Sequence, residues 1–343
     1  MVANKQEAHA AVAPAAIAAD MARPRSRWAL WFVIASIVLG WAAWAGWTEF
    51  NPAAERTLRV AVHEWLETRF TDVMDQDDGW HGLYQRTPGE GADAPVVVLV
   101  HGLDEPGTIW RDLIPALGAR GHQVWELRYP NDQGIDRSAA FLASHWHTFD
   151  PDRPVFLVGH SMGGLVIREF VSRWRHPVGV PERTAGAPVA GLILGGTPNQ
   201  GSEWARMRAL LEFRDQLPAM AEKRHPAFAG LRDGTGVAKI DLRPGSDFLD
   251  ALNARPWPAD VPVVLIAGKL TELSPTLGDG VVALDSIALP AYPPPVIVNA
   301  SHRGMFLRVF SAETEPPAIP YVLEALDRWT GCLLYTSPSP RDR

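Results

Sequence analysis

The sequence has almost no cysteine and no excess of positive charge. Of its 343 residues, only Cys332 is a cysteine, which rules out internal disulfides and thiolate metal sites but leaves the redox compartment open. The formal net charge is −7 at pH 7. A chain this acidic argues against nucleic acid as a partner. We also find no internal repeat and no cluster of metal-ligating residues, so we expect no metal ion and no organic cofactor.

The last twelve residues, 332–343 (CLLYTSPSPRDR), show no hydrophobic periodicity. They resemble a sequencing adapter translated in frame, so we expect the native protein to continue differently after Gly331 and leave this tail out of the fold. Removing the tail (two arginines, one aspartate) and residues 1–53 (four basic, three acidic) changes the net charge from −7 to −9. The remaining residues, about 280, suit one large α/β domain.

Charge is also missing from residues 28–47, which directly follow Arg23, Arg25 and Arg27. Twenty helical residues span roughly 30 Å, the thickness of a bilayer core. We predict a disordered cytoplasmic tail over 1–27 and a transmembrane anchor over 28–47. Because the arginines precede the span, the rest of the chain is expected on the extracytoplasmic side of a bacterial inner membrane. Tryptophans lie near both ends of the span, as in membrane aromatic belts: Trp28, Trp31, Trp41, Trp44 and Trp47.

Two other interpretations of this apolar stretch are open. Ala43-Trp44-Ala45 fits the cleavage pattern of a signal peptide, although the apolar region is long for one. A buried core helix is the other interpretation, and it suits poorly a stretch that is apolar on all sides.

Residues 54–75 predict an amphipathic helix. Two placements are open for it: packing on the main body, which is the commoner case, and lying on a membrane surface. The apolar residues near one face are Leu58, Val62, Trp65, Leu66, Phe70 and Val73.

From residue 80 onwards, strand-like runs alternate with helical patterns, which predicts an α/β fold with a mostly parallel sheet and helices on both faces. We expect the domain to cover 54–331. The first two strands, 80–87 and 95–100, are predicted as a hairpin because a turn cluster separates them. The later strands are expected at 123–129, 155–158, 189–195, 261–267 and 295–299, and the helices at 109–119, 136–148, 162–174 and 318–330.

Residues 201–260 are too long for a simple crossover and predict a helical cap. Its first part carries apolar residues among many charges. These residues either complete the core or form a roof over a ligand pocket. They are Trp204, Met207, Leu211 and Phe213.

The chain is organised around residues 155–174 (VFLVGHSMGGLVIREFVSRW). An apolar strand here turns into an amphipathic helix within a few residues, so Ser161 is expected to be exposed at a strained turn. Gly159 and Gly163 are needed because a Cβ would crowd the strand against the helix. This is the pattern of a nucleophile elbow; the alternative is an ordinary strand–helix turn with a chance serine.

A serine hydroxyl needs a base, and the base needs a carboxylate that fixes its tautomer. Three histidines follow Ser161. His302 lies in a loop just after a predicted strand, which makes it the candidate base, whereas His176 ends the elbow helix and His225 lies in the cap.

The acid is expected after the strand at 261–267. Asp279 is the first choice because Gly278 and Gly280 let the backbone bring its carboxylate close to His302. Asp285 is the reserve, and Glu272 the third candidate. The N–H groups of Met162 and Leu103 are expected to hold the oxyanion.

Five motifs in order, HGLDEPGTIW, GHSMGG, GGTPNQGSEWA, GDGVVALDS and NASHRG, resemble those of bacterial α/β-hydrolase lipases and esterases, including the triacylglycerol-lipase and GPI-inositol-deacylase-like branch. The resemblance covers roughly residues 96–330. It implies an α/β-hydrolase fold with the cap inserted after the sixth strand, and hydrolysis of small-molecule or lipid carboxylic esters by Ser161, Asp279 and His302. An acyltransferase with the same residues and a non-catalytic scaffold for an envelope partner remain open.

Overall fold

The structure is a computed structural model. It describes residues 27–74, 80–91, 94–105, 107–207, 234–271, 277–290, 292–308 and 315–336. The chain divides into two compact units, residues 1–47 and 48–343, which are described separately.

The first unit is built on helix α1 (Arg27–Phe50). Its segment Leu30–Phe50 is long and apolar enough to cross a membrane, and its apolar 18-residue window contains no buried residue. A signal sequence near an N-terminus has the same properties. The helix therefore covers the predicted span, and membrane anchoring stays a prediction.

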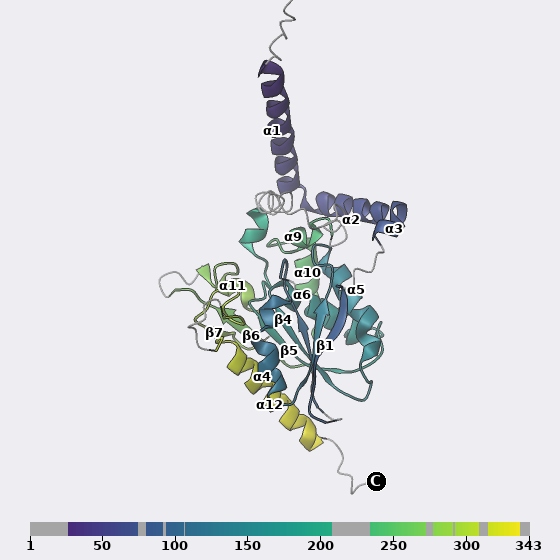
Figure 1. Ribbon diagram of the computed structural model, residues 1–343, viewed down its shortest axis with the longest axis vertical. Coiled ribbons are helices and arrows are strands. Elements are labelled where there is room, and N and C mark those ends of the chain that lie inside the picture. Colours follow the sequence, from purple (N-terminus) through teal and green to yellow (C-terminus); the bar gives the residue numbers. More distant parts are fainter. Residues whose placement is uncertain are drawn as a thin grey trace, which may run out of the picture. The chain divides into compact units, whose positions relative to one another are not determined.

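A seven-stranded sheet forms the centre of the second unit, in the order β1-β3-β2-β4-β5-β6-β7 (Figure 1). Strand β1 runs antiparallel to β3, and all other neighbours are parallel. The strands are β1 (Gly82–Pro88), β2 (Val96–Val100), β3 (Gln123–Arg128), β4 (Val155–His160), β5 (Val189–Gly195), β6 (Val263–Gly268) and β7 (Val296–Val298).

The predicted hairpin of the first two strands is wrong. Strand β1 pairs with β3, and β2 lies between β3 and β4. The burial of the two strands gives the reason. All five residues of β2 are buried, so it belongs where both faces of the sheet are covered, whereas the partly exposed β1 belongs at an edge.

Helices cover both faces of the sheet, as predicted (Figure 1). In β2, the side chains of Val96, Val98 and Val100 join a core with α5 and α6. Val97 and Leu99 point the other way, into a core with α4 and α12. The helices are α4 (Leu113–Gly118), α5 (Ile135–His145), α6 (Met162–Glu169) and α12 (Ile319–Thr336), with short turns η1 (Thr108–Trp110) and η2 (Trp146–Thr148).

The ends of two helices differ in how well the sequence predicts them. Helix α6 continues as the π-helical turn η3 (Phe170–Arg175) and stops before Pro177, as expected. Helix α12 runs to Thr336, five residues into the tail that the sequence analysis excludes. Residues 332–336 contain neither proline nor glycine, and the next proline is Pro338, so nothing local ends the helix earlier.

The predicted helix at 54–75 is present as α2 (Pro52–Arg69) and α3 (Thr71–Met74). Helix α2 packs on the body, which was the commoner of the two expectations. The side that faces the body is polar, however: the buried residues of α2 are Glu55 and His63. The predicted apolar residues Leu58, Val62 and Trp65 are exposed, and the Val73 side chain lies outside the described structure.

The insertion follows β5, the fifth strand along this chain, so its strand number is one lower than the resemblance implies. Its described parts are η4 (Glu203–Met207), α9 (Val237–Asp241) and α10 (Asp247–Ala254), and α11 (Leu284–Ile287) comes after β6. Trp204 is exposed. Leu211, Phe213 and the Met207 side chain lie outside the described residues, so the predicted stripe stays a prediction.

Candidate active site

Ser161 occupies the turn between β4, which ends at His160, and α6, which begins at Met162. Its backbone has φ 54° and ψ −128°, a region that non-glycine residues rarely adopt. A Cβ on Gly159 would lie 2.6 Å from the Gly164 backbone, and one on Gly163 would lie 2.1 Å from the Val100 carbonyl oxygen. The two glycines therefore permit the close strand–helix contact that exposes Ser161.

His302 and Asp279 form a buried hydrogen-bonded pair. The distance between His302 Nδ1 and Asp279 Oδ2 is 2.7 Å. The other carboxylate oxygen, Oδ1, accepts hydrogen bonds from the backbone N–H groups of Val281 (2.9 Å) and Val282 (2.8 Å). Since the carboxylate accepts from Nδ1–H, Nε2 is the basic nitrogen of the neutral ring.

The backbone around Asp279 explains why glycines flank it. Gly278 has φ 54° and Gly280 has φ 93°, both in the left-handed region that favours glycine. A Cβ on Gly278 would lie 1.9 Å from the Val282 carbonyl oxygen. The His302 N–H donates to the Asp279 carbonyl at 3.0 Å, so the two residues are joined through both backbone and side chain.

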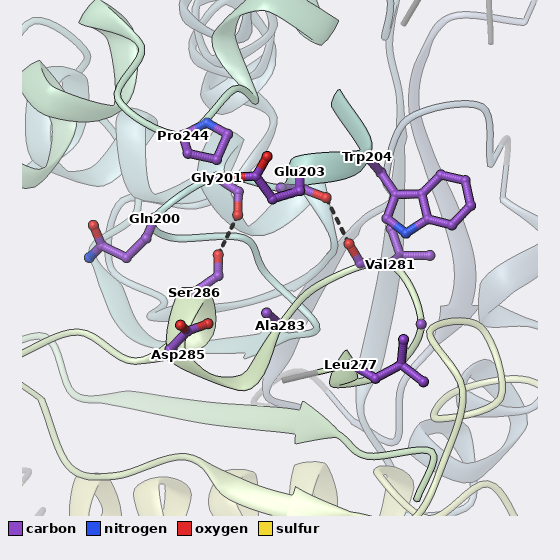
Figure 2. Close-up of a pocket in the computed structure, with 12 residues that line it drawn as sticks. Gln200, Gly201, Glu203, Trp204, Pro244, Leu277, Val281, Ala283, Asp285 and Ser286 are labelled. Atoms are coloured by element: carbon purple, nitrogen blue, oxygen red, sulfur yellow. Dashed lines mark hydrogen bonds between the residues drawn. The ribbon is translucent and has the colours of Figure 1, made fainter. Parts of the chain in front are cut away.

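The other candidate residues lie elsewhere or outside the description. Asp285 sits on α11 and lines a neighbouring cavity of about 420 Å³ with Gln200 and Ser286 (Figure 2). His176 Nε2 accepts a hydrogen bond from the Val189 N–H at 3.0 Å, which is a structural contact. Glu272 and His225 lie outside the described residues.

Ser161 and His302 line one cavity of about 470 Å³, together with Leu103. The same cavity is bordered by Lys239 and Leu242, from α9 and its end. The structure thus brings the candidate nucleophile, the candidate base and one of the candidate oxyanion donors to a common space of the size of a small-ligand site.

The loop after β2 lies directly against Ser161. A Cβ on Gly102 would meet the Ser161 Cβ at 2.8 Å, so only a glycine allows this approach. The Tyr129 hydroxyl donates to the His101 carbonyl at 2.6 Å. The backbone N–H of Asp104 donates a hydrogen bond to a side chain on the loop after β3. The backbone of Asp104 has φ 54°. The path of Leu103 past the nucleophile is therefore fixed by neighbouring loops.

The second candidate oxyanion donor, the Met162 N–H, stands at the first position of α6. The N–H groups of a helix's first turn have no partner within the helix, and the helix dipole makes this end favourable for negative charge. An oxyanion next to Ser161 would meet this end of the helix.

A second histidine, His160, lies under the site in a contact that the sequence analysis does not predict. Its Nε2–H donates to the His302 carbonyl at 2.9 Å, and its Nδ1 lies 2.9 Å from Glu105 Oε2. Arg303 Nε lies 2.8 Å from the other oxygen of Glu105. Glu105 and Arg303 were missed because no local pattern marks them; only the fold brings their two loops to the end of β4.

The electrostatics of this cluster favour a positive charge on His160 and a negative charge on Glu105. Burial by itself lowers the pKa of His160, but the charge and hydrogen bond of Glu105, the His302 carbonyl and the Asp279 charge together outweigh it, and the pKa is raised. Burial likewise raises the pKa of Glu105, but His160 and then His302 and Arg303 hold it below its usual value. His101 differs, because burial lowers its pKa to about 4 and keeps it neutral.

Within the part of the chain that the structure describes, no group of three or more histidine, cysteine, aspartate or glutamate side chains is arranged to hold a metal ion.

Comparison with known proteins gives one family. A family model described as "Alpha/beta hydrolase family" matches residues 97–314, which is more than half of the chain. The match begins in β2 and includes Ser161, Asp279 and His302.

Two curated relatives match parts of the chain. Phospholipase YtpA of Bacillus subtilis is 33% identical over 99 residues, which are 25% of this chain and 38% of that protein. Epoxide hydrolase B of Mycobacterium tuberculosis is 28% identical over 150 residues, 38% of each protein. The chain therefore spans well under half the length of these relatives.

Among solved structures, a metagenomic carboxyl esterase covers 70% of this chain and 76% of its own, with a TM-score of 0.51 and 21% identity. At this identity, the likeness concerns the fold.

Proposed function

The chain belongs to the alpha/beta hydrolase family, and from this premise we propose that it is a serine hydrolase that cleaves carboxylic esters through Ser161, His302 and Asp279. The observation that carries the proposal is the shared cavity: a serine at a strained strand–helix turn faces the same space as a histidine whose Nδ1 is held by a buried carboxylate.

In the first half of the reaction, His302 Nε2 takes the proton of the Ser161 hydroxyl while Oγ bonds to the ester carbonyl carbon. The carbonyl electron pair moves to its oxygen, which the N–H groups of Leu103 and Met162 stabilise. The C–O bond to the alcohol then breaks, the alcohol leaves with the proton from His302, and an acyl group remains on Ser161.

In the second half, water enters the cavity and gives a proton to His302 as it attacks the acyl carbon. The bond to Ser161 Oγ breaks, and His302 returns the proton to Oγ. Asp279 holds the His302 tautomer and stabilises the imidazolium in both halves. An alcohol in place of water would give acyl transfer, and product analysis with added alcohols separates the two outcomes.

The serine favours an ester over an epoxide as the substrate. A serine oxygen that opened an epoxide would be left as an ether, which water does not readily displace. An ester substrate leaves an acyl-enzyme, which water attacks in the same way as the original ester. The name of the Bacillus phospholipase agrees with ester cleavage, and that of the mycobacterial epoxide hydrolase stands for the alternative.

Substitution of the nucleophile tests this function. Ser161→Ala removes one hydroxyl from the turn, so we expect the full chain in detergent to fold normally and to lose at least about 10³-fold in kcat on p-nitrophenyl esters. Ser144→Ala, on the exposed side of α5, is the control and should keep its activity. If Ser161→Ala retained a tenth of the wild-type turnover, the assignment of the nucleophile would be wrong.

The proposal includes an anchored, extracytoplasmic enzyme. Three arginines precede the apolar span Leu30–Phe50, and Glu49 is the only charged residue among the first few after Trp47, a distribution typical of a cytoplasmic N-terminus. A reporter that fluoresces only in the cytoplasm, fused after Gly331, should stay dark in bacterial cells. A bright fusion would reverse the orientation.

A further inference from the structure

Helix α2 shows its apolar face to the outside. Leu58, Val62 and Trp65 follow one another at steps of four and three residues, so they share one face of the helix. They are 43%, 43% and 57% exposed. The Phe70 ring packs edge-on against Trp65, with ring centroids 5.8 Å apart. On a helix that packs on a protein core, such a stripe would face inward.

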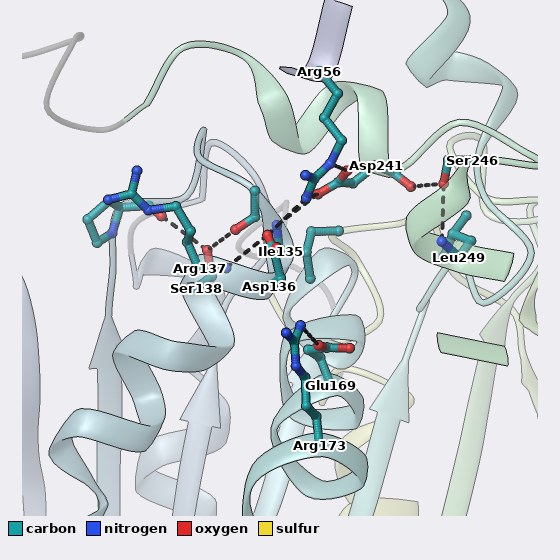
Figure 3. Close-up of polar contacts among 12 residues, drawn as sticks. Arg56, Ile135, Asp136, Arg137, Ser138, Glu169, Arg173, Asp241, Ser246 and Leu249 are labelled. Carbon is teal, nitrogen blue, oxygen red and sulfur yellow. Dashed lines mark hydrogen bonds and ion pairs between the residues drawn. The ribbon is translucent and has the colours of Figure 1, made fainter. Parts of the chain in front are cut away.

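The opposite face is held to the body by charge. Arg56 Nε lies 2.7 Å from Asp241 on α9, and Arg56 Nη2 lies 3.0 Å from Asp136 on α5 (Figure 3). In the last turn of α2, Glu67 accepts two hydrogen bonds from Arg137, at 2.9 and 3.0 Å. These contacts fix the rotation of α2 about its own axis, so the outward direction of the apolar stripe is built into the fold.

The position of α2 in the chain indicates what covers the stripe. A single residue, Asn51, separates the candidate membrane span of α1, Leu30–Phe50, from the start of α2 at Pro52. If that span crosses a bilayer, α2 must start at the bilayer surface. A helix with an apolar stripe on one side and charges on the other lies in that interface with the stripe among the acyl chains. Tryptophan, as at position 65, is enriched there.

We propose that Leu58, Val62, Trp65 and Phe70 form a membrane-binding surface that lies in the same bilayer as α1, and that the substrate is an ester lipid of that bilayer. The second part rests on the proposed ester hydrolysis. The choice of a lipid substrate follows from helix α9, which contacts α2 and also borders the catalytic cavity. Asp241 binds Arg56 of α2, and the neighbouring residues Lys239 and Leu242 line the cavity. Binding of α2 to the bilayer therefore holds the catalytic cavity close to the lipid surface.

A labelling experiment tests the surface without using activity. In the full chain with Cys332→Ser, Val62→Cys is labelled with an environment-sensitive fluorophore and the protein is reconstituted in phosphatidylcholine–phosphatidylglycerol vesicles. Ile297→Cys, on the exposed edge strand β7, is the matched control. Nitroxide-bearing lipids should quench the label at 62 strongly and the label at 297 weakly, and aqueous iodide should do the reverse.

Equal access of iodide to both labels would overturn the proposal. Protection of the label at 62 from both quenchers, together with cross-linking between two copies through Val62→Cys, would also overturn it and would identify a second copy of the chain as the partner.

An activity comparison tests the consequence for substrate. The triple variant Leu58→Ser, Val62→Ser, Trp65→Ser removes only exposed side chains, so hydrolysis of soluble p-nitrophenyl butyrate should stay within twofold of wild type. Hydrolysis of a long-chain ester lipid in the vesicles should fall about tenfold. Val178→Ser with Val180→Ser, at two exposed positions between η3 and β5, should change neither rate.

The two rates separate the two proposals. If the wild-type protein hydrolysed neither the soluble ester nor the lipid, the proposed ester hydrolysis itself would be wrong. The quenching result would be unaffected. An unchanged lipid rate in the folded triple variant would show that α2 does not serve the reaction.

Discussion

Two buried carboxylates in this protein look alike and differ in what surrounds them. Asp279 and Asp241 are both almost fully buried, and each lies 2.7 Å from a nitrogen of a basic side chain. The partner of Asp279 is His302, which borders a cavity and whose imidazole ring can accept and donate a proton. The partner of Asp241 is Arg56, which stays protonated and binds a second carboxylate, Asp136.

The difference shows that burial and a short distance do not by themselves identify a catalytic pair. In a catalytic pair, the basic side chain must also be able to gain and lose a proton, and there must be space for the substrate beside the pair. In the proposed mechanism Asp279–His302 meets both conditions, whereas Asp241–Arg56 meets neither, although Asp241 lies next to a residue that lines the same cavity. Substitution of Asp279 should therefore lower turnover, whereas substitution of Asp241 should lower stability and leave turnover nearly unchanged.

The largest difference is expected in turnover. Asp279→Asn should lower kcat on a soluble ester by roughly 10³–10⁴, because the amide no longer selects the reactive His302 tautomer. Asp285→Asn, in the neighbouring cavity, should leave kcat within about threefold. Steady-state kinetics at pH 7.5 give both values, and the reverse ranking would transfer the role to Asp285.

His101 is also buried, but its hydrogen-bond partner is a backbone carbonyl and not a charged side chain. Burial lowers the pKa of His101 from 6.5 to about 4. Below pH 6.5 the unfolded chain binds a proton at His101 that the folded protein does not bind. The folded protein therefore loses stability as the pH falls from 6.5 towards 4. The loss should reach about 3 kcal/mol.

Urea unfolding at several pH values between 7 and 4 measures this loss. His101→Asn, which keeps a donor for the Gly102 carbonyl, should remove that part of the acid sensitivity. An identical pH dependence in wild type and variant would show that His101 is not the group responsible.

The smallest effect is expected at the structural pair. Asp241→Asn leaves the Arg56 charge with one carboxylate, Asp136, and we expect a loss of about 2 kcal/mol in the free energy of unfolding, since Arg56 is partly exposed to water. The kcat on a soluble ester should stay within about threefold. A loss of turnover without a loss of stability would mean that Asp241 belongs to the catalytic group and that the distinction drawn above fails.

The sequence predicts the centre of the sheet and the Ser161 turn well because both depend on local features. The apolar run in β4 and the spacing of Gly159 and Gly163 determine the turn without help from distant residues. The pairing of His302 with Asp279 is predictable from chain order, since both follow late strands whose carboxyl ends meet at one edge, together with the glycines that flank Asp279.

The errors and omissions come from contacts between distant parts of the chain. The hairpin prediction fails because adjacency in sequence competes with burial, and burial places β2 in the centre of the sheet. The periodicity of α2 shows that an apolar stripe exists but not which way it faces, because its direction depends on Asp136, Arg137 and Asp241, about 70 to 185 residues away. Glu105 and Arg303 join His160 only once their two loops are folded against the end of β4.

Covalent labelling tests whether Ser161 is the nucleophile of an ester hydrolase. The full chain in detergent is treated with a fluorophosphonate, and the modified residue is located by mass spectrometry of its peptides. We expect one adduct, on Ser161, formed much more slowly in Asp279→Asn and not at all in Ser161→Ala. No adduct on the active, folded wild type, or an adduct on a different residue, would contradict it.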